Sequence, residues 1–108
     1  MITFTTFQTL ALSFPEAIAQ AHFEKISYRV AKKIFATYDE KTNRACIKLN
    51  KIDQQVFCMI DVEMISPVPN KWGKQGWTFI ALQKITKALC KDALTKSYQQ
   101  VAPKRLLK

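Results

Sequence analysis

The sequence predicts an α+β domain, a two-layer sandwich in which helices pack on one face of a five-stranded antiparallel sheet. Two observations support this fold class, and together they give the element order α-β(3)-α-β(2)-α. Apolar residues recur at three- and four-residue spacing near both ends of the chain, but alternate with polar residues between residues 25 and 49. Short turns separate the alternating segments, and consecutive strands joined by short turns pair antiparallel.

A first helix is expected over residues 3–12. Phe4, Phe7 and Leu10 fall on one apolar stripe. Thr3 is expected to cap the helix at its N-terminus. Pro15 is expected to end it, because the residue before a proline avoids the helical region.

Three strands are expected next, over residues 26–30, 34–38 and 45–49. In the first of them apolar side chains alternate with Lys25 and Arg29. This pattern predicts a half-buried strand whose outer face is cationic.

A second helix is expected from Asn50 to about Asp61, because Asn50 with Asp53 three residues later is typical of a helix N-terminus. Five residues are expected to form its apolar face: Ile52, Val56, Phe57, Met59 and Ile60.

Two further strands are expected over residues 63–68 and 77–82, followed by a C-terminal helix that ends before Pro103. Its apolar stripe consists of Leu89, Cys90, Ala93, Leu94, Ser97 and Val101. The Ser97 hydroxyl is expected to bond back to a carbonyl of its own helix. Residues 104–108 are expected to form a loose basic tail.

The segment from Pro67 to Trp77 contains both tryptophans, both glycines and two of the four prolines of the chain. Proline fixes φ and glycine alone adopts positive φ cheaply, so this composition predicts a loop of defined shape. Its indole rings, Trp72 and Trp77, are large apolar surfaces. The loop is therefore either a packed corner of the fold or a recognition surface.

Length and charge bound the function. The 108 residues suit a single domain, residues 1–108, and a net charge of +9 favours polyanionic partners. The alternative is that the lysines only keep the protein soluble. Cys46, Cys58 and Cys90 form no C-x-x-C motif, and no apolar run approaches the length of a membrane span. We therefore expect a soluble cytoplasmic protein with reduced thiols and no membrane contact, and a monomer is favoured over an oligomer.

Several short motifs occur in the order seen in one known family. They are Ala11-Leu12-Ser13-Phe14-Pro15, His22-Phe23, Ser27-Tyr28-Arg29-Val30, Lys33-Ile34-Phe35-Ala36-Thr37, Trp72-Gly73-Lys74-Gln75-Gly76-Trp77 and Ser97-Tyr98. Over nearly its whole length the chain thus resembles the MmcQ/YjbR family. The resemblance implies a fold similar to the type III secretion chaperones, with the same element order. It also implies DNA binding, an activity assigned to the family mainly by structural analogy.

The chain departs from that family between its first two strands. Family members often have a glycine there, whereas this sequence reads Ala31-Lys32-Lys33. Tight two-residue hairpins favour asparagine and glycine, so this segment argues against a simple tight hairpin.

Catalytic chemistry has little support. His22 is the only histidine, and no nucleophile signature accompanies it. The three scattered cysteines have no zinc-ligand spacing, and only Cys46 is expected to be exposed as a redox candidate. Gly73 and Gly76 do not form a phosphate-binding loop. We expect no catalytic residues, no metal and no cofactor, and a protein that is not an enzyme.

Nucleic-acid binding is the leading hypothesis. Cations of the first strand, its following turn, a neighbouring strand and the tryptophan loop are expected to lie on one side, where an exposed indole can stack on a base. The candidate residues are Lys25, Arg29, Lys32, Lys33, Lys48, Lys71, Trp72, Lys74 and Gln75. The structural alternative is a solvated sheet face, with Trp72 packed against Pro67 or Pro69.

A protein-binding adapter or chaperone-like module is the second hypothesis. Its exposed sheet face would present Phe35, Tyr38 and Ile80 to a partner. A face rich in lysine and arginine favours nucleic acid, whereas a face rich in these apolar residues favours protein contact.

Overall fold

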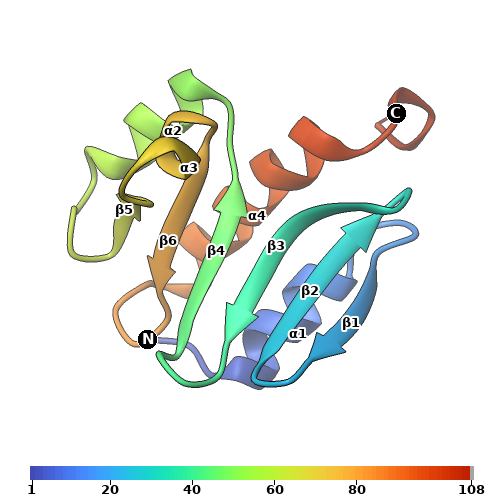
Figure 1. Ribbon diagram of the computed structural model, residues 1–108, viewed down its shortest axis with the longest axis horizontal. Coiled ribbons are helices and arrows are strands. Elements are labelled where there is room, and N and C mark those ends of the chain that lie inside the picture. The colour runs from blue at the N-terminus through green and yellow to red at the C-terminus, as the bar shows by residue number, and fades with distance from the viewer. Residues whose placement is uncertain (108) are drawn as a thin grey trace.

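The computed structural model describes residues 1–107 and has an α+β architecture built on one antiparallel sheet (Figure 1). The sheet has six strands in the spatial order β1-β2-β3-β4-β6-β5. The elements are α1 (Phe4–Leu12), β1 (Ile18–His22), β2 (Lys25–Val30), β3 (Lys33–Asp39), β4 (Arg44–Lys48), α2 (Lys51–Cys58), β5 (Ile65–Pro67), α3 (Lys71–Lys74), β6 (Trp77–Ala81), α4 (Lys87–Val101) and the 3₁₀ turn η1 (Lys104–Leu106).

The prediction of five strands was wrong by one, because β1 was not expected. All five residues of β1 are exposed, since it lies at an edge of the sheet and no helix in the described part of the chain covers it. A strand that is exposed on both faces shows no apolar alternation, which was the signal used to find the others. The other five strands agree with their expected positions to within a few residues.

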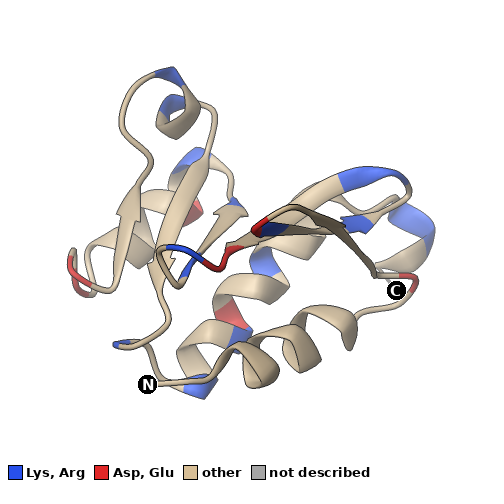
Figure 2. Cartoon of the chain, turned by 60° about the horizontal axis from the view of Figure 1, so that its bottom comes forward, with Lys and Arg blue, Asp and Glu red and all other residues tan. Residues whose placement is uncertain are grey.

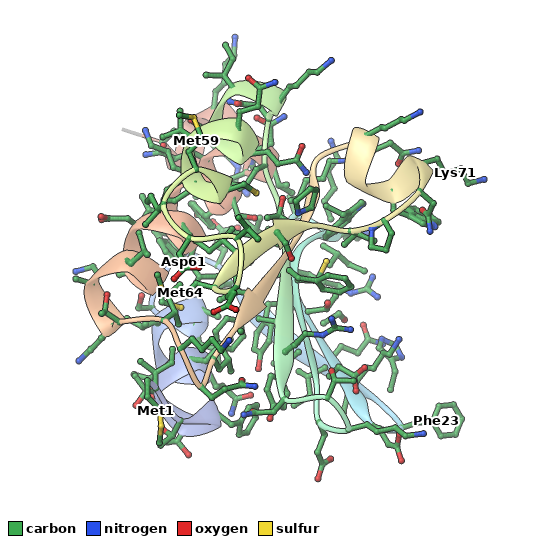
Figure 3. All side chains as sticks on the ribbon, turned by 90° about the vertical axis from the view of Figure 1, so that its left-hand side faces the viewer. Met1, Phe23, Met59, Asp61, Met64 and Lys71 are labelled. Atoms are coloured by element: carbon green, nitrogen blue, oxygen red, sulfur yellow. The ribbon has the colours of Figure 1, made fainter. Side chains whose placement is uncertain are left out.

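The helices do not all lie on one face. The long helices α1 and α4 pack against one face of the sheet, where α4 contacts β3 and β4. The single turn α3, which was expected to be loop, lies on the opposite side (Figure 3). Within residues 1–107, no long helix covers the opposite face of β2, β3, β4 and β6, which is called the open face below.

The expected helix boundaries follow from their caps. The Thr3 hydroxyl accepts a hydrogen bond from the N–H of Thr6, and the Asn50 side chain accepts one from the N–H of Asp53. Thr86 caps α4 in the same way, by accepting from the N–H of Leu89. Each cap satisfies a backbone donor that the first turn of a helix leaves without a partner.

The core lies between the sheet and the helices α1 and α4. Its largest fully buried side chains are Tyr28, Phe7, Phe35, Ile47, Leu49, Ile65, Ile80, Leu82, Ile85 and Leu94. At its centre the ring of Tyr98 stacks on Phe14, with centroids 4.8 Å apart, and meets Phe35 edge-on. The Tyr98 hydroxyl donates a hydrogen bond to the carbonyl of Pro15, which joins α4 to the end of α1.

A β-bulge in β3 explains why Phe35 and Ala36 are both buried. The register between β2 and β3 shifts between Tyr28 and Arg29, so Arg29 pairs with Ile34 and Tyr28 pairs with Ala36. Phe35 is the extra residue. As a result Ile34 and Thr37 lie on the open face, while the two residues between them face the core.

The β2–β3 connection is a tight two-residue hairpin, which corrects the expectation drawn from its sequence. Val30 pairs with Lys33, and Ala31 and Lys32 both have positive φ, at 50° and 69°. Positive φ at both central residues defines a type I′ turn, whose twist matches that of the flanking strands. The strand twist has imposed this turn on two residues that do not favour it.

The apolar face expected for α2 was also wrong. Only Phe57 of the five expected residues is buried, whereas Ile52, Val56, Met59 and Ile60 are each more than half exposed. The inward face of α2 instead carries the polar side chain of Gln54. The Gln54 amide nitrogen lies within hydrogen-bond distance of the carbonyls of Gly73 and Trp77 and of the Thr78 hydroxyl.

Ser97 does not bond back to its own helix as expected. Its hydroxyl instead donates to the carbonyl of Phe35 in β3 and accepts from the N–H of Lys48 at the end of β4. One residue of α4 thus connects two strands. The basic tail expected over residues 104–108 contains η1 and an ion pair between Arg105 and Glu16, and its last residue lies outside the described part of the chain.

Candidate functional site

The open face of the sheet combines cations with aromatic rings. Strand registers place alternate side chains of four strands on it: Lys25, Ser27 and Arg29 of β2; Ile34, Thr37 and Asp39 of β3; Arg44, Cys46 and Lys48 of β4; and Trp77 and Phe79 of β6. Figure 2 shows that lysine and arginine also occur elsewhere, for example along α4. The open face differs from those regions because its cations lie beside rings.

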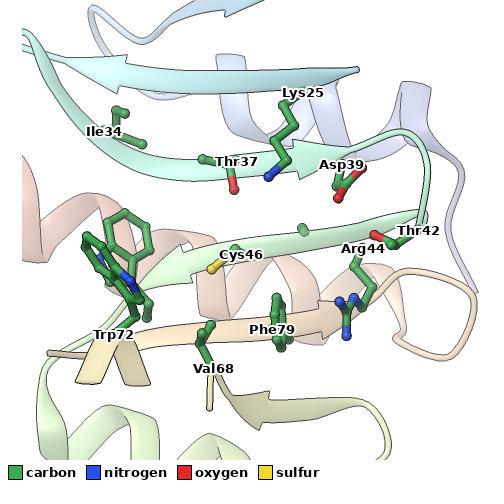
Figure 4. Close-up of a pocket in the computed structure, with 12 residues that line it drawn as sticks. Lys25, Ile34, Thr37, Asp39, Thr42, Arg44, Cys46, Val68, Trp72 and Phe79 are labelled. Carbon is green, nitrogen blue, oxygen red and sulfur yellow. The ribbon is translucent and has the colours of Figure 1, made fainter. Parts of the chain in front are cut away.

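A hollow of about 430 Å³ lies on this face, between β3, β4 and β6 and the overhanging α3 (Figure 4). Its aromatic walls are Trp72, Trp77 and Phe79. Trp72 is 51% exposed, so its indole is not sealed in the core. Lys25 and Arg44 line the hollow as its cations, and Asp39 lies beside them.

Two cations lie over the rings. The guanidinium carbon of Arg44 is 3.9 Å from the centroid of the Phe79 ring. The Nζ atom of Lys48 is 5.3 Å from the centroid of the Trp77 ring. Both distances fall within the range of a cation–π interaction, which holds a charged group against an apolar surface. The exposed side chain of Arg44 is thereby held over the Phe79 ring on the open face.

The position of α3, and therefore of Trp72, is fixed from both sides. Asn70 caps the turn by accepting a hydrogen bond from the N–H of Trp72, and Gln54 donates to the carbonyl of Gly73. Gly73 itself packs on the backbone, because a Cβ atom there would lie 1.9 Å from the carbonyl oxygen of Val68. The glycine expected to shape the loop thus allows α3 to lie close against the sheet.

Most of the predicted site residues lie on or around the open face. Lys25, Arg29 and Lys48 project from its strands, and Lys33 lines a smaller hollow together with Lys48. Lys32 is in the turn at the end of β2. Trp72 lines the large hollow.

The remaining predicted residues lie on α3 or directly after it, and they diverge from one another. Lys71 projects from the outer side of α3, beyond the open face (Figure 3). Lys74 points away from the hollow and lines a separate groove with Lys51 and Gln54. Gln75 is exposed and caps α3 through its backbone N–H; it is not among the described residues that line the large hollow. Lys74 and Gln75 therefore do not join the candidate site.

Sequence reasoning missed three residues of the site: Arg44, Trp77 and Phe79. The sequence could have placed Arg44 at the site, because it alternates with Cys46 and Lys48 along one strand. The sequence of β6 contains no charge, and its aromatic and β-branched residues are typical of a buried strand. Only the absence of a helix over this side of the sheet shows that Trp77 and Phe79 face the open side.

The titratable groups of the hollow do not favour catalysis by a thiol. Burial raises the pKa of Cys46 from its ordinary value of 9.0 to about 11, although Arg44 and Lys25 lower it slightly. A thiol with this pKa is almost entirely protonated at neutral pH, so it is a poor nucleophile. Among residues 1–107, no cluster of three histidine, cysteine or acidic side chains is placed to hold a metal ion.

The residues expected to serve an adapter surface on the sheet are buried. Phe35 and Ile80 are fully buried and Tyr38 is nearly so, all three in the core. That expectation was therefore wrong for these residues, because each lies on the helix-covered face. Exposed apolar side chains gather instead on and just after α2: Ile52, Val56, Met59, Ile60 and Val62.

None of the helices over residues 1–107 has both the length and the apolar character that crossing a membrane requires. In comparisons with known proteins, a sequence model of the YjbR family matches residues 12–100. The crystal structure of the Deinococcus radiodurans protein DR2400, which has a DUF419 domain, superposes with a TM-score of 0.77 at 17% sequence identity. The superposition covers 93% of this chain and 78% of that protein. No curated protein matches.

Proposed function

The chain belongs to the YjbR family, and we propose that this member binds nucleic acid, as an unpaired strand, across the open face of its sheet. The observation that supports this proposal is the hollow at the centre of the face. Three aromatic rings line it, and Lys25, Arg29, Arg44 and Lys48 lie within or beside it. The proposed role is binding without catalysis.

The arrangement suits a flexible strand better than a duplex. In a duplex the base faces are stacked on one another, so they do not reach a ring at the bottom of a hollow. An unpaired base can stack on the indole of Trp72 or on the guanidinium plane of Arg44, and such stacking is worth about 1–3 kcal/mol per base. The carboxylate of Asp39 is an acceptor for a base amino group.

Phosphates would contact the cations around the hollow. Lys25 and Arg29 project from β2 on one side, and Lys48 projects from β4 on the other. A strand that crosses from β2 to β4 would therefore meet a cation before and after the aromatic rings. If it neutralises four phosphates, the logarithm of the binding constant should fall with the logarithm of the salt concentration with a slope of about −2.8.

Fluorescence anisotropy with a labelled oligodeoxythymidine and a labelled hairpin duplex tests the proposal. We expect the single strand to bind more tightly, with a dissociation constant between about 10⁻⁴ and 10⁻⁶ M at moderate salt. Both tryptophans line the hollow, so quenching of intrinsic fluorescence should accompany binding. Absence of binding at about 50 mM salt, where charges attract strongly, would contradict the proposal.

A matched pair of variants locates the binding surface. Trp72→Ala removes a half-exposed ring from the hollow, whereas Lys87→Ala/Lys91→Ala removes two exposed cations from α4. We expect the first variant to weaken binding about tenfold or more, because one stacked base is lost. The α4 variant should bind almost as the wild type does. Weakening by the α4 variant but not by Trp72→Ala would indicate attraction to net charge alone.

A second candidate function, protein binding, is supported by the exposed apolar side chains of α2. Isolated apolar residues are normal on a surface, but contiguous groups of several hundred Å² often mark an interface. Ile52, Val56 and Met59 recur at helical spacing, which suits the apolar face of a helix in a partner protein. A pull-down with the wild type and with Ile52→Ser/Met59→Ser tests this function. A specific partner should be lost by the variant, while its affinity for nucleic acid is unchanged.

A further inference from the structure

The two edges of the sheet differ in how they are protected. The edge strand β5 has three residues and ends at Pro67, with Pro69 two residues later. Short length and proline are devices that prevent an edge from pairing with another chain. The opposite edge, β1, has five residues, Ile18 to His22, with no lysine, proline or acidic residue among them. All five are exposed, and Figure 1 shows β1 as the outermost strand on its side.

The register of the β1–β2 hairpin determines which backbone groups of β1 face outward. His22 pairs with Lys25 across a two-residue turn, so these two residues form the first hydrogen-bonded pair. Hydrogen-bonded and non-hydrogen-bonded pairs alternate along an antiparallel ladder. Ile18, Gln20 and His22 therefore bond toward β2. The N–H and carbonyl groups of Ala19 and Ala21 point away from the sheet.

We propose that β1 pairs antiparallel with β1 of a second copy of the chain, around a two-fold axis that passes beside Gln20. In this register Ala19 of one copy lies opposite the partner's Ala21, and each such pair exchanges two backbone hydrogen bonds. Gln20 lies opposite the partner's Gln20 in a non-hydrogen-bonded pair, as its inward-bonding backbone requires. The two six-stranded sheets become one continuous sheet.

Three features of β1 favour its pairing with the same strand of a second copy. Its charge is neutral in a chain of net charge +9, so the contact itself brings no like charges together. The residues whose backbone groups point outward are alanines, and their small side chains, which point to a face of the sheet, do not obstruct a second strand. The Gln20 amide can both donate to and accept from an identical amide on the axis. Identical strands in antiparallel register satisfy the requirement that a two-fold interface be self-complementary.

The turn that follows β1 also supports pairing with a second copy. Phe23, in the turn that follows the strand, has a φ of 57° and a fully exposed ring. A non-glycine residue held in this region, with a large apolar side chain in solvent, is unfavourable in an isolated chain. In the proposed register Phe23 lies beside the partner's Ala17, so pairing would cover part of the ring.

The interface is small, so the dimer is expected to be weak and to depend on concentration. Two five-residue strands bury less surface than the roughly 1,200 Å² of an ordinary stable complex. The net charge of +9 on each copy opposes association, and salt screens that repulsion. Added salt should therefore strengthen the dimer, whereas it weakens the binding of nucleic acid. This opposite response separates the present inference from the proposed function.

Analytical ultracentrifugation from about 10 μM to about 1 mM measures the association. We expect a monomer–dimer equilibrium in the wild type. Ala21→Pro removes an outward N–H without removing a bond to β2, and Gln20→Lys places two like charges on the axis; both should abolish the dimer. Gln99→Lys makes the same chemical change on the exposed side of α4 and should leave the dimer intact. A dimer retained by both β1 variants would overturn the proposal.

Disulfide cross-linking tests the register directly. Opposed residues of a non-hydrogen-bonded pair have Cα atoms about 4.5 Å apart, within the range of a disulfide. In a Cys58→Ser background, which removes a partly exposed thiol, Gln20→Cys should form a covalent dimer under mild oxidation. Ala19→Cys should not, because two such residues are displaced from each other along the strand. A monomer at every concentration without cross-linking, or capture only of a foreign extended peptide, would exclude the second copy as the occupant.

Discussion

The hydroxyl of Ser97 in α4 donates a hydrogen bond to the carbonyl of Phe35 in β3, with 2.5 Å between the oxygens. The same hydroxyl accepts a bond from the N–H of Lys48, at 3.1 Å. The β3–β4 ladder has Ala36 opposite Ile47 as its last pair at this end. Phe35 and Lys48 would form the next pair of the ladder, but the Ser97 hydroxyl bonds to both instead. It thereby joins two strands that diverge there. Because Lys48 is held in this way, the interior of the fold also positions a cation of the open face.

Replacing Ser97 with alanine should lower the free energy of unfolding by about 1–3 kcal/mol, because two buried backbone groups lose their partner. Urea denaturation measures this change. Thr95→Ala is the control, since its exposed hydroxyl donates only to the carbonyl of Lys91 in the same helix. That variant should stay within about 0.5 kcal/mol of the wild type. Equal values for the two variants would show that the bridge contributes nothing.

The β2–β3 turn offers a stabilising substitution. Ala31 and Lys32 both occupy left-handed conformations that asparagine and glycine adopt more easily. Ala31→Asn/Lys32→Gly should therefore raise the free energy of unfolding by about 1 kcal/mol or more. Thermal denaturation measures the gain. Lys41→Gly lies in another exposed turn but not at positive φ, and it should give no gain.

Gly76 should not tolerate a side chain. Its φ is 107°, and an added Cβ would lie 1.9 Å from the carbonyl oxygen of Leu49. Gly76→Ala should cost about 3 kcal/mol or more, because both the backbone conformation and the contact become unfavourable. Gln75→Ala, at the exposed neighbouring position, should change stability by no more than about 0.5 kcal/mol. Denaturation midpoints of the two variants that coincide would contradict this account.

The cations near the hollow should contribute unequally to binding. Lys25→Ala and Lys48→Ala should each reduce the salt slope for a single strand by about 0.7, the contribution of one phosphate contact. Lys74→Ala should leave the slope unchanged, because Lys74 points to the far side of α3. Anisotropy titrations at three or more salt concentrations give the slopes. The assignment of the binding surface fails if Lys74→Ala has the same effect as Lys25→Ala.

Stability should fall in alkaline solution. Burial raises the pKa of Cys46 to about 11 and of Cys90 to about 12, from 9.0, and the pKa of Tyr28 from 10.0 to about 12. Between about pH 9 and pH 12 the unfolded chain therefore binds fewer protons than the folded chain. The stability that these protonated, buried groups contribute is fully present below about pH 9. It is lost as the pH rises through their pKa values in the folded chain.

Urea midpoints at pH 7, 9, 10 and 11 test this dependence. Cys46→Ala/Cys90→Ala removes two of the three groups, so its midpoint should fall less steeply above pH 9, whatever its stability at neutral pH. A wild-type midpoint that stays constant up to pH 11 would show that these groups are accessible to water in the folded state.

The predictable parts of the fold depend on local patterns. The caps Thr3 and Asn50, the alternation through β2 and β4 and the stripe of α4 were all recognisable, because each is set by neighbours within a few residues. The missed features depend on the rest of the molecule. The edge position of β1 leaves it no apolar pattern, the bulge at Phe35 arises from pairing with β2, and strand twist imposes the turn at Ala31 and Lys32.

The candidate site was predictable only in part for the same reason. Strand alternation identified Lys25, Arg29 and Lys48, but which face of β6 is open depends on where the helices pack. Many residues that suggested the family lie in the interior: Phe14, Phe35 and Tyr98 form the aromatic cluster, and Ser97 forms the bridge. The resemblance at these residues therefore indicates a shared fold. The binding role proposed for the open face rests on the residues of that face.

The packing of α4 also determines when the chain can fold. This helix spans Lys87–Val101, covers β3 and β4, and is tied to the start of the chain through Tyr98 and Pro15. During synthesis the ribosome makes this helix after all six strands of the described chain. Until then the core-facing side of β3 and β4 lacks the helix that covers it, and a nascent chain in that state is prone to aggregate. The fold therefore cannot be completed before α4 has been made.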